Sequence, residues 1–169
     1  ALKKALVAYA NTNYISSSVF DELYIGGGSP SVISNSQIID LLDFCRSTFN
    51  LKTDHTTKFT ACTTNLSREK IDVLSSNNVQ QLDIGIQTFN ESLRKNLMIR
   101  DSSRSAKEKL ILSRKSGLRV SIDLLYNLPG QTLDQWVDDI KQAIEIEVES
   151  VDCYPLDLYP ETQLAKRII

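Results

Sequence analysis

The sequence predicts an α/β fold, a partial parallel (β/α) barrel of the TIM type with about five strands. Short apolar runs rich in β-formers alternate with amphipathic helical runs along the 169 residues. Consecutive strand centres lie about 30 residues apart, the length of one strand–helix unit. A doubly wound sheet has the same alternation. The barrel is favoured because Ser29, Gln87 and Asp123 lie at or just beyond the carboxyl halves of predicted strands, where barrel active sites assemble.

The beginning of the chain is unusual for a barrel. Leu2, Leu6 and Ala10 are apolar at helical spacing, and no strand precedes them. Residues 1–18 are therefore expected to be the end of a first core helix, and residues 19–169 a partial barrel. Because a barrel begins with a strand, we expect a fragment that lacks an N-terminal segment and a C-terminal domain.

The remaining elements follow from local pattern. Apolar, β-rich runs predict strands at residues 22–25, 58–62, 81–86, 119–125 and 150–158. Helical periodicity predicts helices over 38–49, from 67, over 91–97, over 103–116 and over 132–147. Ser34 with Gln37 forms a capping box, Thr132 is an N-cap, and Gly117 is placed to end a helix.

Composition excludes several classes of function. A net charge of −2 and a pI near 5.5 argue against a nucleic-acid platform. No apolar run approaches the roughly 20 residues that cross a bilayer, and no signal-peptide pattern opens the chain. A cytoplasmic protein without a membrane span or a nucleic-acid partner is expected.

The cysteines predict no metal site within this chain. Cys45, Cys62 and Cys153 are an odd number at irregular spacing, unlike a secreted disulfide framework or a local thiolate cluster. Cys45 and Cys62 suit small buried positions. His55, the only histidine, lies in a stretch that is expected to be a polar, exposed loop.

A run of three glycines, Gly26–Gly28, ends the first predicted strand and is followed by Ser29 and Pro30. Without Cβ atoms, such a loop can adopt positive φ and let its backbone approach a ligand. A plain strand-to-helix turn needs one glycine, or two. The run therefore favours a loop that binds a polar or anionic small molecule.

Three motifs occur in a fixed order. They are Gly-Gly-Gly-Ser-Pro at 26–30, Gly-Ile-Gln-Thr-Phe at 85–89 and Asp-Leu-Leu-Tyr-Asn-Leu-Pro-Gly-Gln-Thr at 123–132. Together they resemble the radical SAM proteins related to oxygen-independent coproporphyrinogen III oxidase. The stretches 151–156 and 159–166 are similar to the ending of the family's heme-utilisation branch.

The resemblance implies a binding site for S-adenosylmethionine. Its residues would be Gly27, Gly28, Ser29, Gln87, Arg100 and Asp123. The loop would meet the amino group of the ligand, and the glutamine would contact the nucleoside. The arginine would lie near the carboxylate, which a forked guanidinium suits, and the aspartate would accept from ribose hydroxyls.

The chain departs from the family pattern in four places. Thr60 replaces a usual glutamate, Asn127 replaces a glycine, and Met98-Ile99-Arg100 replaces Leu-Gly-Arg. The Cys-x-x-x-Cys-x-x-Cys motif, which in the family lies upstream of these residues, is absent. Without its three thiolates no [4Fe–4S] cluster forms and S-adenosylmethionine is not reductively cleaved. This chain alone is therefore expected to be inactive.

The resulting expectation is a fragment of a radical SAM enzyme that acts on heme or a related porphyrin. The resemblance implies S-adenosylmethionine and a [4Fe–4S] cluster in the longer parent, with a reductant such as flavodoxin or ferredoxin. The alternatives are an enzyme like oxygen-independent coproporphyrinogen III oxidase, a heme chaperone, or a degenerate binding module without catalysis.

Overall fold

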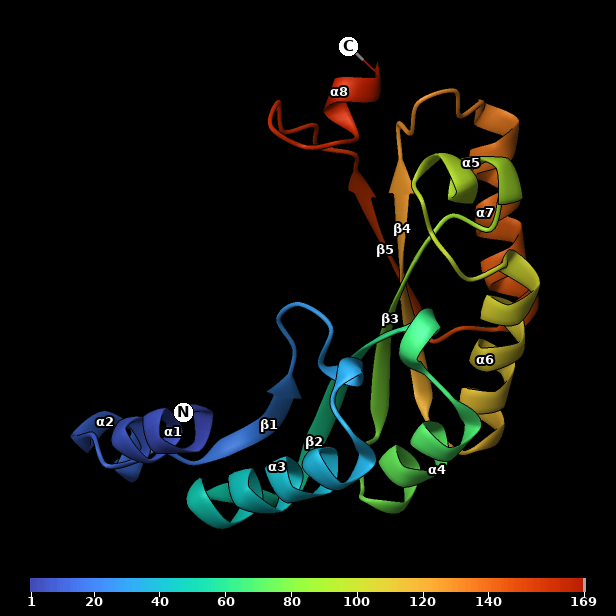
Figure 1. Ribbon diagram of the computed structural model, residues 1–169. Helices are drawn as coiled ribbons and strands as arrows, with labels where there is room; N and C mark the ends of the chain where they lie inside the picture. Colours follow the sequence, from blue (N-terminus) through green and yellow to red (C-terminus); the bar gives the residue numbers. More distant parts are fainter. Residues whose placement is uncertain (169) are drawn as a thin grey trace.

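The computed structural model describes residues 1–168, and its centre is a curled parallel sheet (Figure 1). Its five strands are β1 (Phe20–Ile25), β2 (Leu51–Cys62), β3 (Gln81–Gln87), β4 (Arg119–Tyr126) and β5 (Ser150–Pro155). They lie in the order β1-β2-β3-β4-β5, and every pairing is parallel. A doubly wound sheet has a reversal in strand order, so the prediction of a partial barrel is confirmed.

The helices are α1 (Leu2–Ala10), α2 (Asn13–Ser17), α3 (Asn35–Thr48), α4 (Arg68–Ser76), α5 (Glu91–Asn96), α6 (Ser103–Lys115), α7 (Leu133–Ile146) and α8 (Ala165–Ile168), with 3-10 turns at Pro30–Val32 and Thr63–Asn65. Most of the helices cover one side of the sheet, whereas α1 and α2 lie beside the beginning of β1 and α8 lies beyond the end of β5 (Figure 1). Ser34 and Thr132 form capping boxes as predicted. Gly117, with φ of 84°, follows α6.

The hydrophobic core lies between the sheet and these helices. Alternate residues of the strands, among them Phe59, Leu82 and Ile122, are fully buried against the helix layer. Ile38 of α3 and Leu110 of α6 pack into the same core. Burying each such side chain contributes about 1.5–3 kcal/mol, which fixes the register of each strand because a slip by one residue would turn these side chains to the other face.

Two predicted strand boundaries are wrong. β2 begins at Leu51 rather than at Lys58, so His55 lies in a strand and not in a loop. Polar residues fill its first half because this part is close to the end of the sheet, where β1 alone pairs with it. β5 ends at Pro155 rather than at Leu158, because its partner β4 ends at Tyr126, which pairs with Pro155.

Candidate functional site

The concave face of the sheet carries polar side chains in rows. The strand register places Thr60, Asp83 and Ser121 in one row, and Gly85 beside Asp123 in the next. The residues between them in each strand point into the helix-covered core. Since parallel strands of a barrel present their carboxyl ends at one rim, the residues at these ends gather at the edge where a ligand can enter.

The glycine loop follows β1 at this rim. Gly27 and Gly28 have φ of 81° and 68°, and a Cβ atom built on either would meet nothing within 4 Å. Their glycine character therefore serves the backbone conformation and leaves open space above the loop. Gly26 differs, because its Cβ would lie 2.5 Å from the Tyr24 ring. Ser29 is half-buried, and its hydroxyl does not cap the turn that follows.

Gln87 ends β3 in a left-handed conformation, with φ of 70°. Its amide nitrogen lies 2.8 Å from the point where a Cβ of Gly85 would be. The side chain therefore folds back over Gly85 on the concave face, next to Asp123, which pairs with Gly85. A non-glycine residue in this region is strained, and such strain concentrates at functional sites.

Asp123 is half-buried in the middle of the concave face. Burial raises the pKa of its carboxyl, and the nearby charges of Asp152 and Asp83 raise it further. Among the side chains of residues 1–166, which the structure describes, none donates a hydrogen bond to this carboxyl. In this part of the chain, the carboxyl is therefore available to accept hydrogen bonds from the hydroxyl groups of a ligand.

The stability of the chain should depend on pH through Asp123. Because the folded chain binds this proton more tightly than the unfolded chain does, the contribution is largest below the ordinary pKa of 3.8 and is lost as pH rises through the raised pKa. Urea unfolding measured from about pH 4 to about pH 7 should show a smaller decline for Asp123→Asn than for wild type. Asp54→Asn, an exposed change in β2, is the control and should follow the wild-type curve.

Arg100 lies in the loop between α5 and α6, and its side chain is exposed. The left-handed residue of this loop is Met98, with φ of 57°. A glycine in the Leu-Gly-Arg pattern of the family would suit this left-handed position. Aligned in that way, Met98 takes the place of the glycine and Ile99 takes the place of the arginine. The structure gathers Gln87 and Asp123 at one place, and it leaves Arg100 turned to solvent.

Thr60, which stands where the family has a glutamate, also lies on the concave face. Its hydroxyl is 2.8 Å from the hydroxyl of Tyr24. Next to it, Lys58 pairs with Glu22 at 2.6 Å. A neutral pair of hydroxyls thus occupies the position of the usual carboxylate, so this spot offers hydrogen bonds to a ligand without negative charge.

Two buried charges hold the end of β3, and sequence reasoning missed both. Arg94 of α5 is 1% exposed and donates to the carbonyls of Ile86 and Thr88. Asp139 of α7 is 0% exposed and accepts from the hydroxyl of Thr88 and the amide of Phe89. Burial raises the pKa of Asp139 above its ordinary value, although these two hydrogen bonds oppose the shift. The available signal was a charged residue at a core-facing helical position.

The cysteines lie on three different elements. Cys45 of α3 is buried, as predicted, and burial raises the pKa of its thiol. Cys62 ends β2 half-buried, and Cys153 is exposed on β5. Across residues 1–168, no group of three or more histidine, cysteine or acidic side chains is arranged to hold a metal ion. These side chains do not fit the ligand set of a [4Fe–4S] cluster, which takes cysteine thiolates around one centre.

A pocket of about 320 Å³ lies elsewhere on the carboxyl side of the molecule. It is lined by Leu93, Lys95, Asn96, Leu97, Leu128, Pro129 and Leu164. None of the predicted ligand-binding residues contributes to it. Among the helices within residues 1–168, none has the length and the apolar character that crossing a membrane requires.

The fold and the rim define a half-barrel with a glycine loop and a strained glutamine at its carboxyl edge and a half-buried carboxylate on its concave face. The chain belongs to the radical SAM superfamily, whose sequence profile matches residues 12–143. The structure of the coproporphyrinogen III oxidase HemN from Escherichia coli has the same fold, with a TM-score of 0.88 at 22% identity over 99% of this chain and 38% of that one.

Two curated relatives with different names are similar to this chain over most of its length. The heme chaperone HemW of Lactococcus lactis is 32% identical over 146 residues, 86% of this chain and 38% of that protein. The anaerobilin synthase of Escherichia coli O157:H7 is 30% identical over 149 residues, 86% of this chain and 33% of that protein. The chain thus spans between a third and two fifths of the length of these two relatives.

Proposed function

We propose that the rim of this half-barrel binds S-adenosylmethionine. The observation that carries the proposal is the strained Gln87, whose side chain lies over Gly85 and beside Asp123. In this arrangement Gln87 donates to or accepts from the nucleoside, and Asp123 accepts from the ribose hydroxyls. Gly27, Gly28 and Ser29 present backbone carbonyls and a hydroxyl to the amino group of the ligand.

Arg100 is the proposed partner of the ligand carboxylate. Its guanidinium is exposed, and it can form two parallel hydrogen bonds with a carboxylate. Its backbone is fixed on one side, because the carbonyl of Asp101 accepts from Arg94. Binding would therefore order the side chain of Arg100 without moving its main chain.

The superfamily as a whole implies S-adenosylmethionine and a [4Fe–4S] cluster. S-adenosylmethionine supplies a radical when a reduced cluster cleaves it. The residues described above bind and orient the ligand, and cleavage needs thiolates that they do not provide. A flavodoxin or ferredoxin is the proposed source of electrons for the whole protein.

We propose heme or a related porphyrin as the substrate of the whole protein. The support is two relatives at about the same identity, one named a heme chaperone and the other an anaerobilin synthase. A heme carrier is the second candidate, favoured by the relative that is named a heme chaperone. Titration of the chain with heme, followed by absorbance, tests the common element of both. An absorbance change no larger than that of heme added to buffer without the protein would contradict both.

The S-adenosylmethionine site is tested by Gln87→Gly. Glycine adopts positive φ freely and removes the strain of a left-handed glutamine, about 1–2 kcal/mol, while it adds unfolded-state entropy, so stability should change by no more than about 1 kcal/mol. The affinity for S-adenosylmethionine, measured by titration calorimetry, should fall at least about fivefold because the side-chain hydrogen bonds are lost.

Asn78→Gly is the matched control for this experiment. Asn78 also has positive φ, 53°, but it lies between α4 and β3, at the amino end of the sheet. Its replacement should leave the affinity unchanged. Equal affinities of wild type and Gln87→Gly, or no binding by wild type at millimolar ligand, would contradict the proposed site.

A further inference from the structure

Cationic side chains from the helix layer hold the backbone at the carboxyl ends of three strands. After β1, Lys70 of α4 donates to the carbonyls of Ser31 and Ile33 at 2.5 and 2.7 Å. After β2, Lys109 of α6 donates to the carbonyl of Thr63 at 2.6 Å. After β3, Arg94 holds two carbonyls in the same way. Hydrogen bonds from the helix layer therefore fix the backbone just after each of these three strands.

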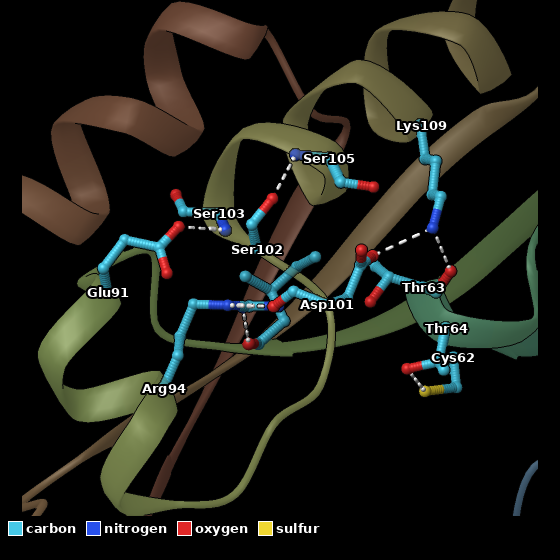
Figure 2. Close-up of polar contacts among 11 residues, drawn as sticks. Cys62, Thr63, Thr64, Glu91, Arg94, Asp101, Ser102, Ser103, Ser105 and Lys109 are labelled. Atoms are coloured by element: carbon cyan, nitrogen blue, oxygen red, sulfur yellow. Dashed lines mark hydrogen bonds and ion pairs between the residues drawn. The ribbon is translucent and has the colours of Figure 1, made fainter.

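Asp101 joins two of these cations (Figure 2). Its backbone carbonyl accepts from Arg94 Nε and Nη2 at 3.0 and 2.9 Å. Its carboxylate Oδ2 accepts from Lys109 Nζ at 2.9 Å, and the two side chains are only 11% and 24% exposed. Burial alone would raise the pKa of Asp101, but hydrogen bonds from Lys109 and Ser105 hold it below its ordinary value. The lowered pKa therefore favours the charged form of the Asp101 carboxyl when the chain is folded.

The connections continue to the glycine loop. The amide of Cys62, the last residue of β2, donates to the hydroxyl of Ser31 at 3.0 Å. Ser31 is fully buried and follows Ser29 by two residues. Hydrogen bonds thus link the loop after β1 to the end of β2, and Lys109 links the end of β2 to the loop that carries Arg100.

We propose that Lys109 is a positioning residue for S-adenosylmethionine. By donating to Asp101 and Thr63, Lys109 holds the loop that carries Arg100 against the end of β2. The inference rests on the proposed function and deepens it. Lys109 does not touch the ligand; it fixes where the backbone on both sides of the site lies. A ligand that meets an ordered rim loses less conformational entropy on binding than one that must order it.

A structural role alone makes a different prediction from a positioning role. Removing a half-buried ion pair in favour of apolar groups of similar size is often neutral for stability. The double variant Asp101→Asn with Lys109→Met removes both charges without leaving one of them unpaired. If Lys109 serves only stability, this variant should bind ligand as wild type does. If it positions the rim, affinity should fall although the variant remains folded; the carbonyl of Thr63 loses its donor, so some loss of stability is expected in either case.

The experiment measures affinity for S-adenosylmethionine by calorimetry and amide exchange without ligand. We expect the double variant to bind roughly tenfold more weakly, and Lys109→Arg, which keeps a cation, to restore affinity to within about threefold. Amides of residues 98–102 should exchange roughly tenfold faster in the double variant, and those of β3 and β4 at the wild-type rate. Arg104→Met, an exposed change on α6, is the control and should alter neither measurement.

Two results would overturn the proposal. One is an affinity of the double variant within about twofold of wild type. The other is faster exchange throughout β3 and β4, which would show that the variant loosens the whole sheet. If wild type itself binds no S-adenosylmethionine, the proposed function fails. The exchange data then decide whether Lys109 orders the loop of residues 98–102. Unchanged exchange of these amides in the double variant would show that it does not.

Discussion

Replacing Arg94 by alanine is expected to lower the free energy of unfolding by about 3–5 kcal/mol. The guanidinium is buried and donates four hydrogen bonds, to the carbonyls of Ile86, Thr88 and Asp101. Alanine leaves these acceptors buried without donors and creates a cavity between α5 and the end of β3. For a chain of this size, thermal unfolding should begin about 10 °C lower.

Two further variants test the cause of this effect. Arg104→Ala removes an exposed arginine that pairs only with Glu108 on the same helix, and it should change stability by less than about 0.5 kcal/mol. Arg94→Lys keeps the charge but lacks the fork that reaches both carbonyl groups, so it should recover only part of the loss. A loss below about 1 kcal/mol for Arg94→Ala would show that water replaces the guanidinium at these carbonyls.

The strand order was predictable because it follows from local patterns. Each strand is followed by a helix that begins at a recognisable cap, as at Ser34 and Thr132. Right-handed crossovers between parallel strands then leave few topologies. The position of Asp123 on the concave face followed from the apolar residues Val120, Ile122 and Leu124. Since successive residues of a strand point to opposite faces, Asp123 faces away from the core that they enter.

Backbone conformation explains departures from the family pattern that the sequence alone left open. Asn127, which stands where the family has glycine, has φ of 61°. Asparagine tolerates this left-handed region better than other non-glycine residues, so the substitution preserves the turn. Met98 occupies the same region with φ of 57°. The motif Leu-Gly-Arg puts the glycine of the family at Ile99, the residue next to Met98. The sequence does not reveal which of the two has positive φ.

The partners of the buried charges that support the rim could not be predicted, although the core-facing positions of these residues were a signal. Charged residues on a helix are usually assigned to the solvent face, because burying them is costly unless every polar atom is paired. Arg94, Asp139 and Lys70 violate this assignment, and each has at least one backbone group near the end of a strand as its partner. Such partners have no side-chain signature, so only the folded arrangement reveals them.

The chain of 169 residues is expected to associate with itself through the edges of its sheet. β1 and β5 are the two ends of the strand order, and each has one side without a strand partner within the described residues. An edge strand of this kind pairs with another chain unless charge, proline or a cover opposes it. Asp21 and Glu22 blunt the beginning of β1, and Pro155 ends β5, but Tyr24 and Tyr154 are exposed on these strands.

Tyr154→Lys should weaken this association about tenfold, since a lysine on an edge strand carries its charge into any strand that pairs there. Tyr14→Lys is the matched control, because Tyr14 is exposed on α2 and belongs to neither edge strand, and the variant should associate as wild type does. Light scattering across a dilution series measures the mass, with a reducing agent present because Cys153 is exposed on the same strand. A wild-type chain that stays monomeric at every concentration would contradict edge pairing. If, in addition, the amides of β1 exchanged as slowly as those of the central β3, the edge of β1 would have to be protected from within the chain, and α1 is the element that lies against Leu23 and Ile25.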